Sequence, residues 1–124
     1  MIDLASIAPA DGALLRRTAT GWLLSSDQPQ WWFIADVALD RELAPGGSAE
    51  VQAEVRAGEV GFSFVGADES RPWSEHVAGP GLVTANLHVS KGDPVPRRIL
   101  LRSCASDDRP AVVEVRSVRL LTPG

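Results

Sequence analysis

Tyrosine is absent from this chain of 124 residues, cysteine occurs once and histidine occurs twice. The single cysteine, Cys104, excludes an internal disulfide, so the stability of the fold has to come from packing. His76, His88 and Cys104 leave few side chains for acid–base or nucleophilic work. A metal centre is not expected either, because the two histidines lie on different elements without the spacing of metal ligands.

Two further catalytic patterns are missing. A serine hydrolase needs its nucleophile on a strand-to-helix turn, whereas Ser63 lies mid-strand within residues 61–65 and without the second glycine of that motif. No glycine-rich phosphate loop precedes a helix. Cys104 has the character of a small, buried residue at a strand end. We therefore expect no enzymatic activity and no cofactor.

Positive charge is also in short supply, since the formal net charge at pH 7 is −4. Duplex nucleic acid and anionic membranes both require a basic face, and the arginine pairs Arg16-Arg17 and Arg97-Arg98 are isolated, so neither partner is expected. The N-terminal residues 1–9 have no basic leader and too short an apolar run for a signal peptide or an anchor. A cytoplasmic location is the resulting expectation.

What the chain does contain is a succession of short runs in which apolar and polar residues alternate, separated by Gly, Pro and Asp. This pattern predicts antiparallel strands. The expected fold is an all-β, antiparallel, two-sheet β-sandwich of about eight strands with a jelly-roll-like arrangement, and an immunoglobulin-like sandwich is the alternative. We expect one domain over residues 1–124, with 1–27 as its N-terminal segment. Within the N-terminal segment, Ile2, Leu4 and Ile7 could begin a first strand. The other predicted strands are 22–24, 31–39, 50–57, 60–65, 82–90, 98–103 and 112–121.

Alternation also sorts side chains within these strands. In 31–39, the odd residues from Trp31 to Leu39 share a core face, which points Trp32 the other way, beside Ile34 and Asp36. Residues 57–59 are short enough for a hairpin turn. Residues 66–81 read as a long loop.

The last strand contains a change of parity. Its apolar residues occupy odd positions at Val113 and Val115 and even positions at Val118 and Leu120. An extra residue in one strand of a pair produces such a change, so we predict a β-bulge near Arg116-Ser117.

Four tryptophans in a chain without tyrosine are the compositional feature that points to recognition. An indole ring offers a flat apolar face for the CH side of a sugar and a donor at its edge. Trp32 and Trp73 are the two candidate stacking platforms. For Trp32 the alternative is burial under the N-terminal segment, and for Trp73 it is anchoring of the predicted loop.

Polar residues of two predicted strands point away from the core and can make the hydrogen bonds that a polyol requires. The alternative is the solvated face of an antiparallel sheet. The acidic pairs Asp68-Glu69 and Asp107-Asp108 are most simply interpreted as solvated residues that form turns, and Ca²⁺ binding is the alternative interpretation. The candidate ligand-binding residues are Glu54, Arg56, Asn86 and His88, together with Trp32 and Trp73. Gln52 is predicted to lie on the same face as the first four of these residues.

Two stretches carry a resemblance to a known module. Residues 58–65 contain Gly-Glu-Val-Gly-Phe-Ser-Phe-Val and are followed by an acidic, Ser-containing loop with Asp68, Ser70 and Ser74-Glu75. Residues 100–103 and 107–120 look like a closing pair of strands, although Ser103 stands where asparagine is expected. Over residues 31–121 the chain resembles an accessory module of bacterial FkbM-type methyltransferases and glycosyltransferases, and it is similar in plan to jelly-roll carbohydrate-binding modules. The resemblance implies a non-catalytic, sugar-associated domain.

Two functional hypotheses follow. The first is a carbohydrate-binding-like accessory module that recognises a glycan or positions a glycan-modifying partner. The second is a protein-interaction or oligomerisation domain without sugar binding. The expected partners are a saccharide ligand, or a protein partner or second copy of the chain.

Overall fold

The computed structural model describes residues 7–9, 13–26, 33–66, 73–104 and 111–121. These residues form strands and no helix, and so no helix long and apolar enough to cross a membrane occurs among them. The strands are β1 (Ala8–Pro9), β2 (Leu14–Arg17), β3 (Trp22–Ser26), β4 (Phe33–Ala38), β5 (Ser48–Ala57), β6 (Val60–Val65), β7 (Trp73–Ala78), β8 (Gly81–His88), β9 (Arg98–Ser103) and β10 (Ala111–Leu121).

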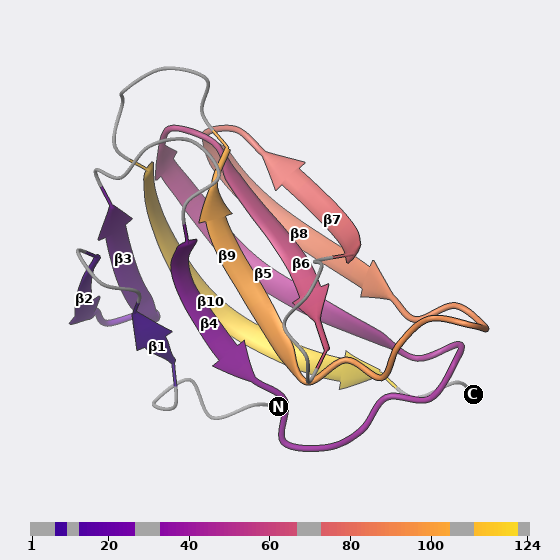
Figure 1. The fold of residues 1–124 in the computed structure, drawn as a ribbon. Coiled ribbons are helices and arrows are strands. Elements are labelled where there is room, and N and C mark those ends of the chain that lie inside the picture. The colour runs from indigo at the N-terminus through magenta and orange to yellow at the C-terminus, as the bar shows by residue number, and fades with distance from the viewer. Residues whose placement is uncertain (1–6, 10–12, 27–32, 67–72, 105–110, 122–124) are drawn as a thin grey trace.

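The strands build two five-stranded sheets that pack face to face (Figure 1). Sheet A has the order β1-β4-β9-β6-β7, and sheet B has the order β2-β3-β10-β5-β8. Every pair of neighbouring strands is antiparallel. The predicted antiparallel two-sheet sandwich is therefore confirmed.

The core lies between the sheets because most of the strands turn an apolar face inward. Strand β5 shows this most simply, since its odd residues from Ala49 to Val55 are buried and its even residues are not. Such alternation buries one face and leaves the other to solvent. The largest fully buried apolar side chains are those of Phe62, Phe64, Leu24, Ile34, Leu87, Ile99 and Leu101.

The bulge predicted near Arg116-Ser117 is confirmed. The register of β10 against β5 shifts between Val115 and Ser117, and Val118 is fully buried after the shift. The extra residue keeps the apolar side chains of both halves of β10 on the core side.

The expected strict alternation in residues 31–39 is wrong at Ile34. This residue is fully buried in the core, as Ala35 and Val37 are, because β4 has a register shift against β9 between Phe33 and Ala35. The bulge turns two successive side chains inward, which alternation alone does not allow. Trp31 and Trp32 lie outside the described residues.

The predicted hairpin at residues 57–59 is also wrong. Strand β5 belongs to sheet B and β6 belongs to sheet A, so the short connection carries the chain from one sheet to the other. Gly58 has a φ of 72°, which a glycine adopts without strain. Since β5 and β6 both need to bury an apolar face, they meet across the core rather than edge to edge.

The predicted long loop over residues 66–81 is interrupted by strand β7, which pairs with β6. Two irregularities hide this strand from periodicity. Ser74 has a φ of 58°, and the register against β6 shifts between Phe62 and Phe64. Trp73 therefore begins a strand instead of lying in a loop.

Replacement of a core aromatic tests the position of the core. Phe62→Ala is expected to lower the free energy of unfolding by about 3–5 kcal/mol, because the ring is fully buried between the sheets. Val77→Ala on the neighbouring strand β7 is the control, since Val77 is 46% exposed, and it should change stability by less than about 0.5 kcal/mol. Urea denaturation followed by tryptophan fluorescence measures both, and equal effects would contradict this core.

Candidate functional site

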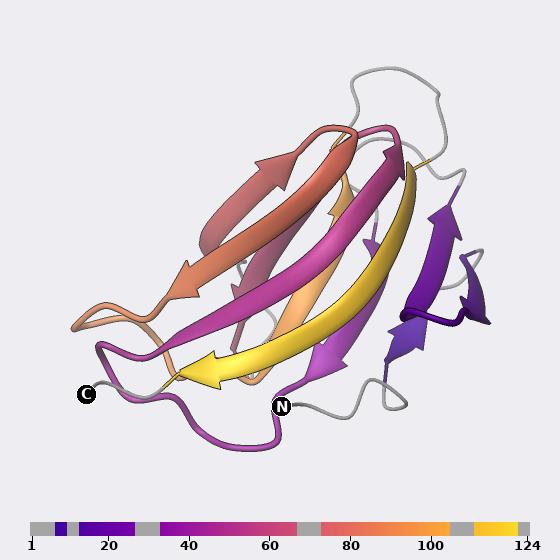
Figure 2. The same cartoon turned by 180° about the vertical axis from the view of Figure 1, so that it is seen from behind.

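The outer face of sheet B carries the polar side chains of β5, β8 and β10, which are neighbours in the sheet (Figure 2). Registered pairs place Glu50 opposite Asn86 and Ser48 opposite His88. Asn86 and His88 are exposed, and Glu54 and Arg56 lie on the same face of β5. The structure thus brings four of the predicted site residues onto one face, and their role in binding stays a prediction.

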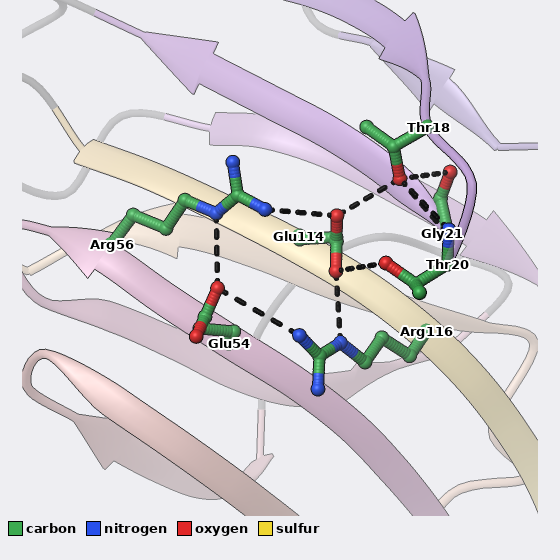
Figure 3. A network of polar contacts seen from close by, with 7 residues as sticks. All are labelled: Thr18, Thr20, Gly21, Glu54, Arg56, Glu114 and Arg116. Atoms are coloured by element: carbon green, nitrogen blue, oxygen red, sulfur yellow. Dashed lines mark hydrogen bonds and ion pairs between the residues drawn. The ribbon is translucent and has the colours of Figure 1, made fainter.

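The centre of this face is the carboxylate of Glu114 on β10, whose side chain is only 1% exposed. Its Oε1 accepts hydrogen bonds from Arg116 Nε at 2.8 Å and from Thr20 Oγ1 at 2.8 Å. Its Oε2 accepts from Thr18 Oγ1 at 2.8 Å and from Arg56 Nη2 at 3.0 Å (Figure 3). A buried carboxylate with this many donors is fully satisfied.

The turn between β2 and β3 supplies the two threonines. It is closed by a hydrogen bond from Thr18 N to Gly21 O at 2.8 Å, and Gly21 N donates to Thr18 Oγ1 at 3.0 Å. Gly21 lies so close to the backbone of Val115 that a Cβ there would collide with the Val115 carbonyl oxygen. The glycine therefore lets the turn approach β10 closely enough to cover Glu114.

A second carboxylate lies directly across the strand pair, because Glu54 on β5 is the registered partner of Glu114. Like charges in this position repel. Two arginines compensate them: Arg56 Nε donates to Glu54 Oε1 at 3.0 Å, and Arg116 Nη2 lies 3.8 Å from the same oxygen. Each guanidinium thus bridges both glutamates.

These contacts lower the pKa of Glu114 to about 2. The largest cause is the hydrogen bond from Arg116, followed by those from Thr20 and Thr18, while burial acts in the opposite direction. The same hydrogen bond raises the pKa of Arg116. Both side chains are held in their charged forms.

A hollow of about 240 Å³ opens beside this network. It combines an aliphatic wall with hydrogen-bonding groups, since Leu82 is 73% exposed at its rim and Arg116 reaches in from the network. No aromatic side chain belongs to its described lining. The lining residues are Gln52, Ala53, Leu82, Val83, Thr84 and Arg116.

The described tryptophans lie elsewhere. Trp73 packs half-buried against the core, with its ring centroid 5.9 Å from that of Phe64. Its Nε1 is buried and has no hydrogen-bond partner among the described residues. Trp22 also packs against the core, beneath the guanidinium of Arg17 at 5.6 Å from the ring centroid. The candidate platform Trp32 lies outside the described residues.

Directly after β9 of sheet A, the Cys104 side chain is buried, as expected. It lies next to Gly61, where a Cβ would come within 2.8 Å of Sγ. Burial raises the pKa of the Cys104 thiol, and the nearby carboxylate of Glu75 adds to the shift. A thiol in these surroundings stays protonated at neutral pH and is a poor nucleophile.

The described residues contain no group of three or more His, Cys, Asp or Glu side chains arranged to hold a metal ion. The two acidic pairs that sequence singled out, Asp68-Glu69 and Asp107-Asp108, lie outside the described residues. Their role as turn formers or Ca²⁺ ligands stays a prediction.

Sequence reasoning missed Glu114, Arg116 and the two threonines. Glu114 lies between the inward-facing Val113 and Val115, but nothing in the local sequence shows that a turn 94 to 96 residues away covers it. The usable signal was the predicted bulge near Arg116-Ser117, which marks the part of β10 next to Glu114. Arg116 lies two residues after Glu114, so alternation places both charged side chains on the outer face.

Comparison with known proteins gives a structural likeness only. No protein-family model matches the sequence, and no curated protein matches it. Among solved structures, the chain is similar to a single-residue variant of the carbohydrate-binding module CBM29-2 in complex with cellulohexaose, with a TM-score of 0.65, 16% identity and coverage of 90% of this chain and 77% of that chain.

Two further structures agree. A family 29 carbohydrate-binding module matches with a TM-score of 0.63 and 15% identity over 90% of this chain and 75% of that one. Another single-residue variant of CBM29-2, in complex with mannohexaose, gives a TM-score of 0.62 and 15% identity over 90% of this chain and 77% of that one. The fold is that of these jelly-roll modules.

Acid titration tests the Glu114 network. Because the pKa of Glu114 is about 2 in the folded chain and near 4.5 in a model peptide, its charge stabilises the fold above about pH 4.5, and this contribution is lost as pH falls toward 2. Glu114→Gln should be less stable than wild type at pH 7 and lose less stability on acidification. Urea denaturation at a series of pH values measures the difference.

Glu42→Gln is the matched control, because the Glu42 side chain is 69% exposed and contacts only Arg97, at 3.5 Å, among its described ion pairs. An exposed pair of this kind contributes little. If Glu114→Gln and Glu42→Gln behaved alike across the acid range, the network would not be an important source of stability.

Replacement of Trp73 distinguishes packing from ligand stacking. Trp73→Ala is expected to lower the free energy of unfolding by about 3 kcal/mol, because the ring packs against Phe64 and the core. Trp73→Phe should retain most of that stability. Unchanged denaturation midpoints for Trp73→Ala, measured with near-UV circular dichroism, would assign the ring a role outside the core.

Proposed function

We propose that this chain is a non-catalytic module that binds an uncharged saccharide on the outer face of sheet B. The observation that carries the proposal is the hollow beside Arg116, where an exposed leucine adjoins amide, hydroxyl and guanidinium groups. A sugar ring presents the same combination, with CH groups on its faces and hydroxyls around its edge. Apolar surface with a few fixed polar groups is typical of small-molecule sites.

The charges of the face support an uncharged ligand. Arg56 and Arg116 are both paired with Glu54 and Glu114, and Arg119 lies 4.0 Å from Glu50. A carboxylated saccharide would have to compete with these glutamates for the arginines. Figure 3 shows a terminal nitrogen of Arg116 directed away from both glutamates. This nitrogen can donate a hydrogen bond to a neutral hydroxyl of a saccharide.

The structural neighbours support the same class of ligand. They are carbohydrate-binding modules, two of them in complex with cellulohexaose and mannohexaose. Both ligands are uncharged hexose chains. For this chain, the hydrogen-bonding residues of the proposed site are Gln52, Thr84 and Arg116, with Asn86 and His88 further along the same face.

A non-catalytic role fits the surroundings of Cys104 and Ser63, two side chains that could otherwise act as nucleophiles. Cys104 is a buried thiol of raised pKa, and Ser63 is fully buried in the middle of β6. We propose that such a module positions a glycan-modifying partner, in line with the resemblance to accessory modules of FkbM-type enzymes. That association, a bacterial origin, a cytoplasmic location and a one-domain organisation over residues 1–124 stay predictions from the sequence.

Saccharide titration tests the proposal. Cellulohexaose and mannohexaose at millimolar concentration should give measurable heats in calorimetry and shift the amide signals of β5 and β8, whereas a hexamer of galacturonic acid should bind at least about tenfold more weakly. Leu82→Ala should weaken binding about tenfold, because it removes the exposed aliphatic wall of the hollow.

Leu14→Ala is the matched control, since Leu14 is also 73% exposed but lies on β2, away from the hollow. It should bind as wild type does. If neither neutral hexasaccharide binds, the proposed function is wrong, and the alternative of a protein-interaction domain without sugar binding gains support.

A further inference from the structure

The outward side chains of sheet B form four successive rows across β8, β5 and β10. Registered partners define the rows, since each outward residue of β5 from Ser48 to Glu54 has one partner on either neighbouring strand. Successive rows are two residues apart along a strand, which is about 7 Å. Written from β8 through β5 to β10, the rows are Leu82-Glu54-Glu114, Thr84-Gln52-Ser117, Asn86-Glu50-Arg119 and His88-Ser48-Leu121.

The hollow beside Arg116 occupies the first two rows only. Its lining includes Leu82, Thr84 and Gln52, but no residue of the third or fourth row. Those two rows continue the same face, and Figure 2 shows β8, β5 and β10 side by side along it. The strip formed by the four rows is about 20 Å long and about 10 Å wide. A saccharide that fills the hollow therefore has further surface of the same sheet beside it.

The third row offers hydrogen-bonding groups. Asn86 is exposed, and no hydrogen bond engages its carboxamide among the described residues. Arg119 is 53% exposed, and its Nη1 lies 4.0 Å from Glu50 Oε1. This ion pair is longer than the one between Arg116 and Glu114, at 2.8 Å. A hydroxyl group can therefore donate to the Glu50 carboxylate and accept from Arg119 without breaking a short ion pair.

The fourth row adds apolar surface. Leu121 is 36% exposed on β10, and the exposed His88 lies on β8, on the other side of Ser48. The strip thus has an exposed leucine at each end, Leu82 and Leu121, and polar groups between them. A chain of hexose units presents both kinds of surface repeatedly, because every ring has CH groups on its faces and hydroxyls at its edge.

The other directions from the hollow are less suitable. Next to Glu114, the turn of Thr18 and Thr20 covers the sheet, with both hydroxyls bonded to that carboxylate. On the opposite side sheet B ends at β8. Toward Arg56, the guanidinium and the two glutamates already satisfy one another. Among the described residues, only the direction toward Asn86 combines open surface with polar groups that are not engaged.

We propose that an uncharged hexose chain runs along β5 from the hollow to the row of His88, so that the site binds several consecutive units of one chain. The inference rests on the proposed function and deepens it. Asn86 and Arg119 supply a second binding position beside the hollow. Leu121 and His88 supply a third. Each added position raises the affinity for a long chain and leaves the affinity for a disaccharide unchanged.

Calorimetric titration with a disaccharide and a hexasaccharide of the same series tests the inference, with cellobiose and cellulohexaose as one series and mannobiose and mannohexaose as the other. Wild type should bind a hexasaccharide more than about tenfold more tightly than its disaccharide. Asn86→Ala and Arg119→Ala should each weaken hexasaccharide binding about fivefold and leave disaccharide binding unchanged. Leu82→Ala should weaken both.

Arg97→Ala is the matched control for Arg119→Ala. Arg97 is 52% exposed and also forms a loose ion pair, 3.5 Å from Glu42, but it directly precedes β9 of sheet A. It should bind every ligand as wild type does.

Amide chemical shifts locate the bound chain. A disaccharide should shift the amides of the first two rows, and a hexasaccharide should extend the shifts to Asn86, His88 and Arg119. If both lengths bound equally tightly and shifted the same amides, the extension along β5 would be wrong and the proposed function would stand. Hexasaccharide binding that is unaffected by both Asn86→Ala and Arg119→Ala would have the same meaning. If no ligand of either series bound, both proposals would be wrong.

Discussion

The buried carboxylate of Glu114 is the constraint on which sheet B depends. A charge taken out of water is costly unless donors replace its hydration, and here they come from three separate parts of the chain. Arg116 is local, Arg56 comes from β5, and Thr18 and Thr20 come from the turn after β2. The carboxylate thus ties the N-terminal hairpin to the centre of the sheet, where apolar contacts alone would leave the hairpin's position less defined.

The same constraint explains the state of the arginines. Glu54 and Glu114 stand opposite each other, so without Arg56 and Arg116 the pair would repel. Each guanidinium donates to or contacts both glutamates, which fixes its plane. The part of Arg116 that lines the hollow is consequently held in place before a ligand arrives. Pre-ordering of this kind reduces the entropy lost on binding.

The sequence predicted the orientation of side chains correctly wherever one face of a strand is buried and the other is exposed to solvent. Strands β5 and β8 followed the period of two, so their outward residues were sorted correctly. A bulge can be found from sequence where the parity of the apolar residues changes across it, as in β10. In β4 the residues from Phe33 to Ala35 are all apolar, so no change of parity marks the shift and Ile34 was assigned to the wrong face. In β7 polar residues interrupt the apolar pattern, and the strand was missed. The sequence of the turn at Gly58 is compatible both with a hairpin and with a crossing between sheets. The turn that contains the threonines covering Glu114 has an ordinary turn composition. Burial of apolar faces across the whole sandwich decides such cases, and this is a property of the packed sheets rather than of any segment.

The two outer faces of the sandwich are not equivalent. On sheet A, every residue of β6 is buried, so Gly61, Ser63 and Val65 are covered although they point away from the core. Leu100 on the adjacent β9 is 6% exposed. On sheet B, by contrast, the outward residues of β8 are all exposed, and the hollow opens among them. A ligand can reach the exposed side chains of β8 on this face without displacing anything described in the structure. Recognition is therefore proposed for the outer face of sheet B, where satisfied charges and an exposed aliphatic group adjoin one another.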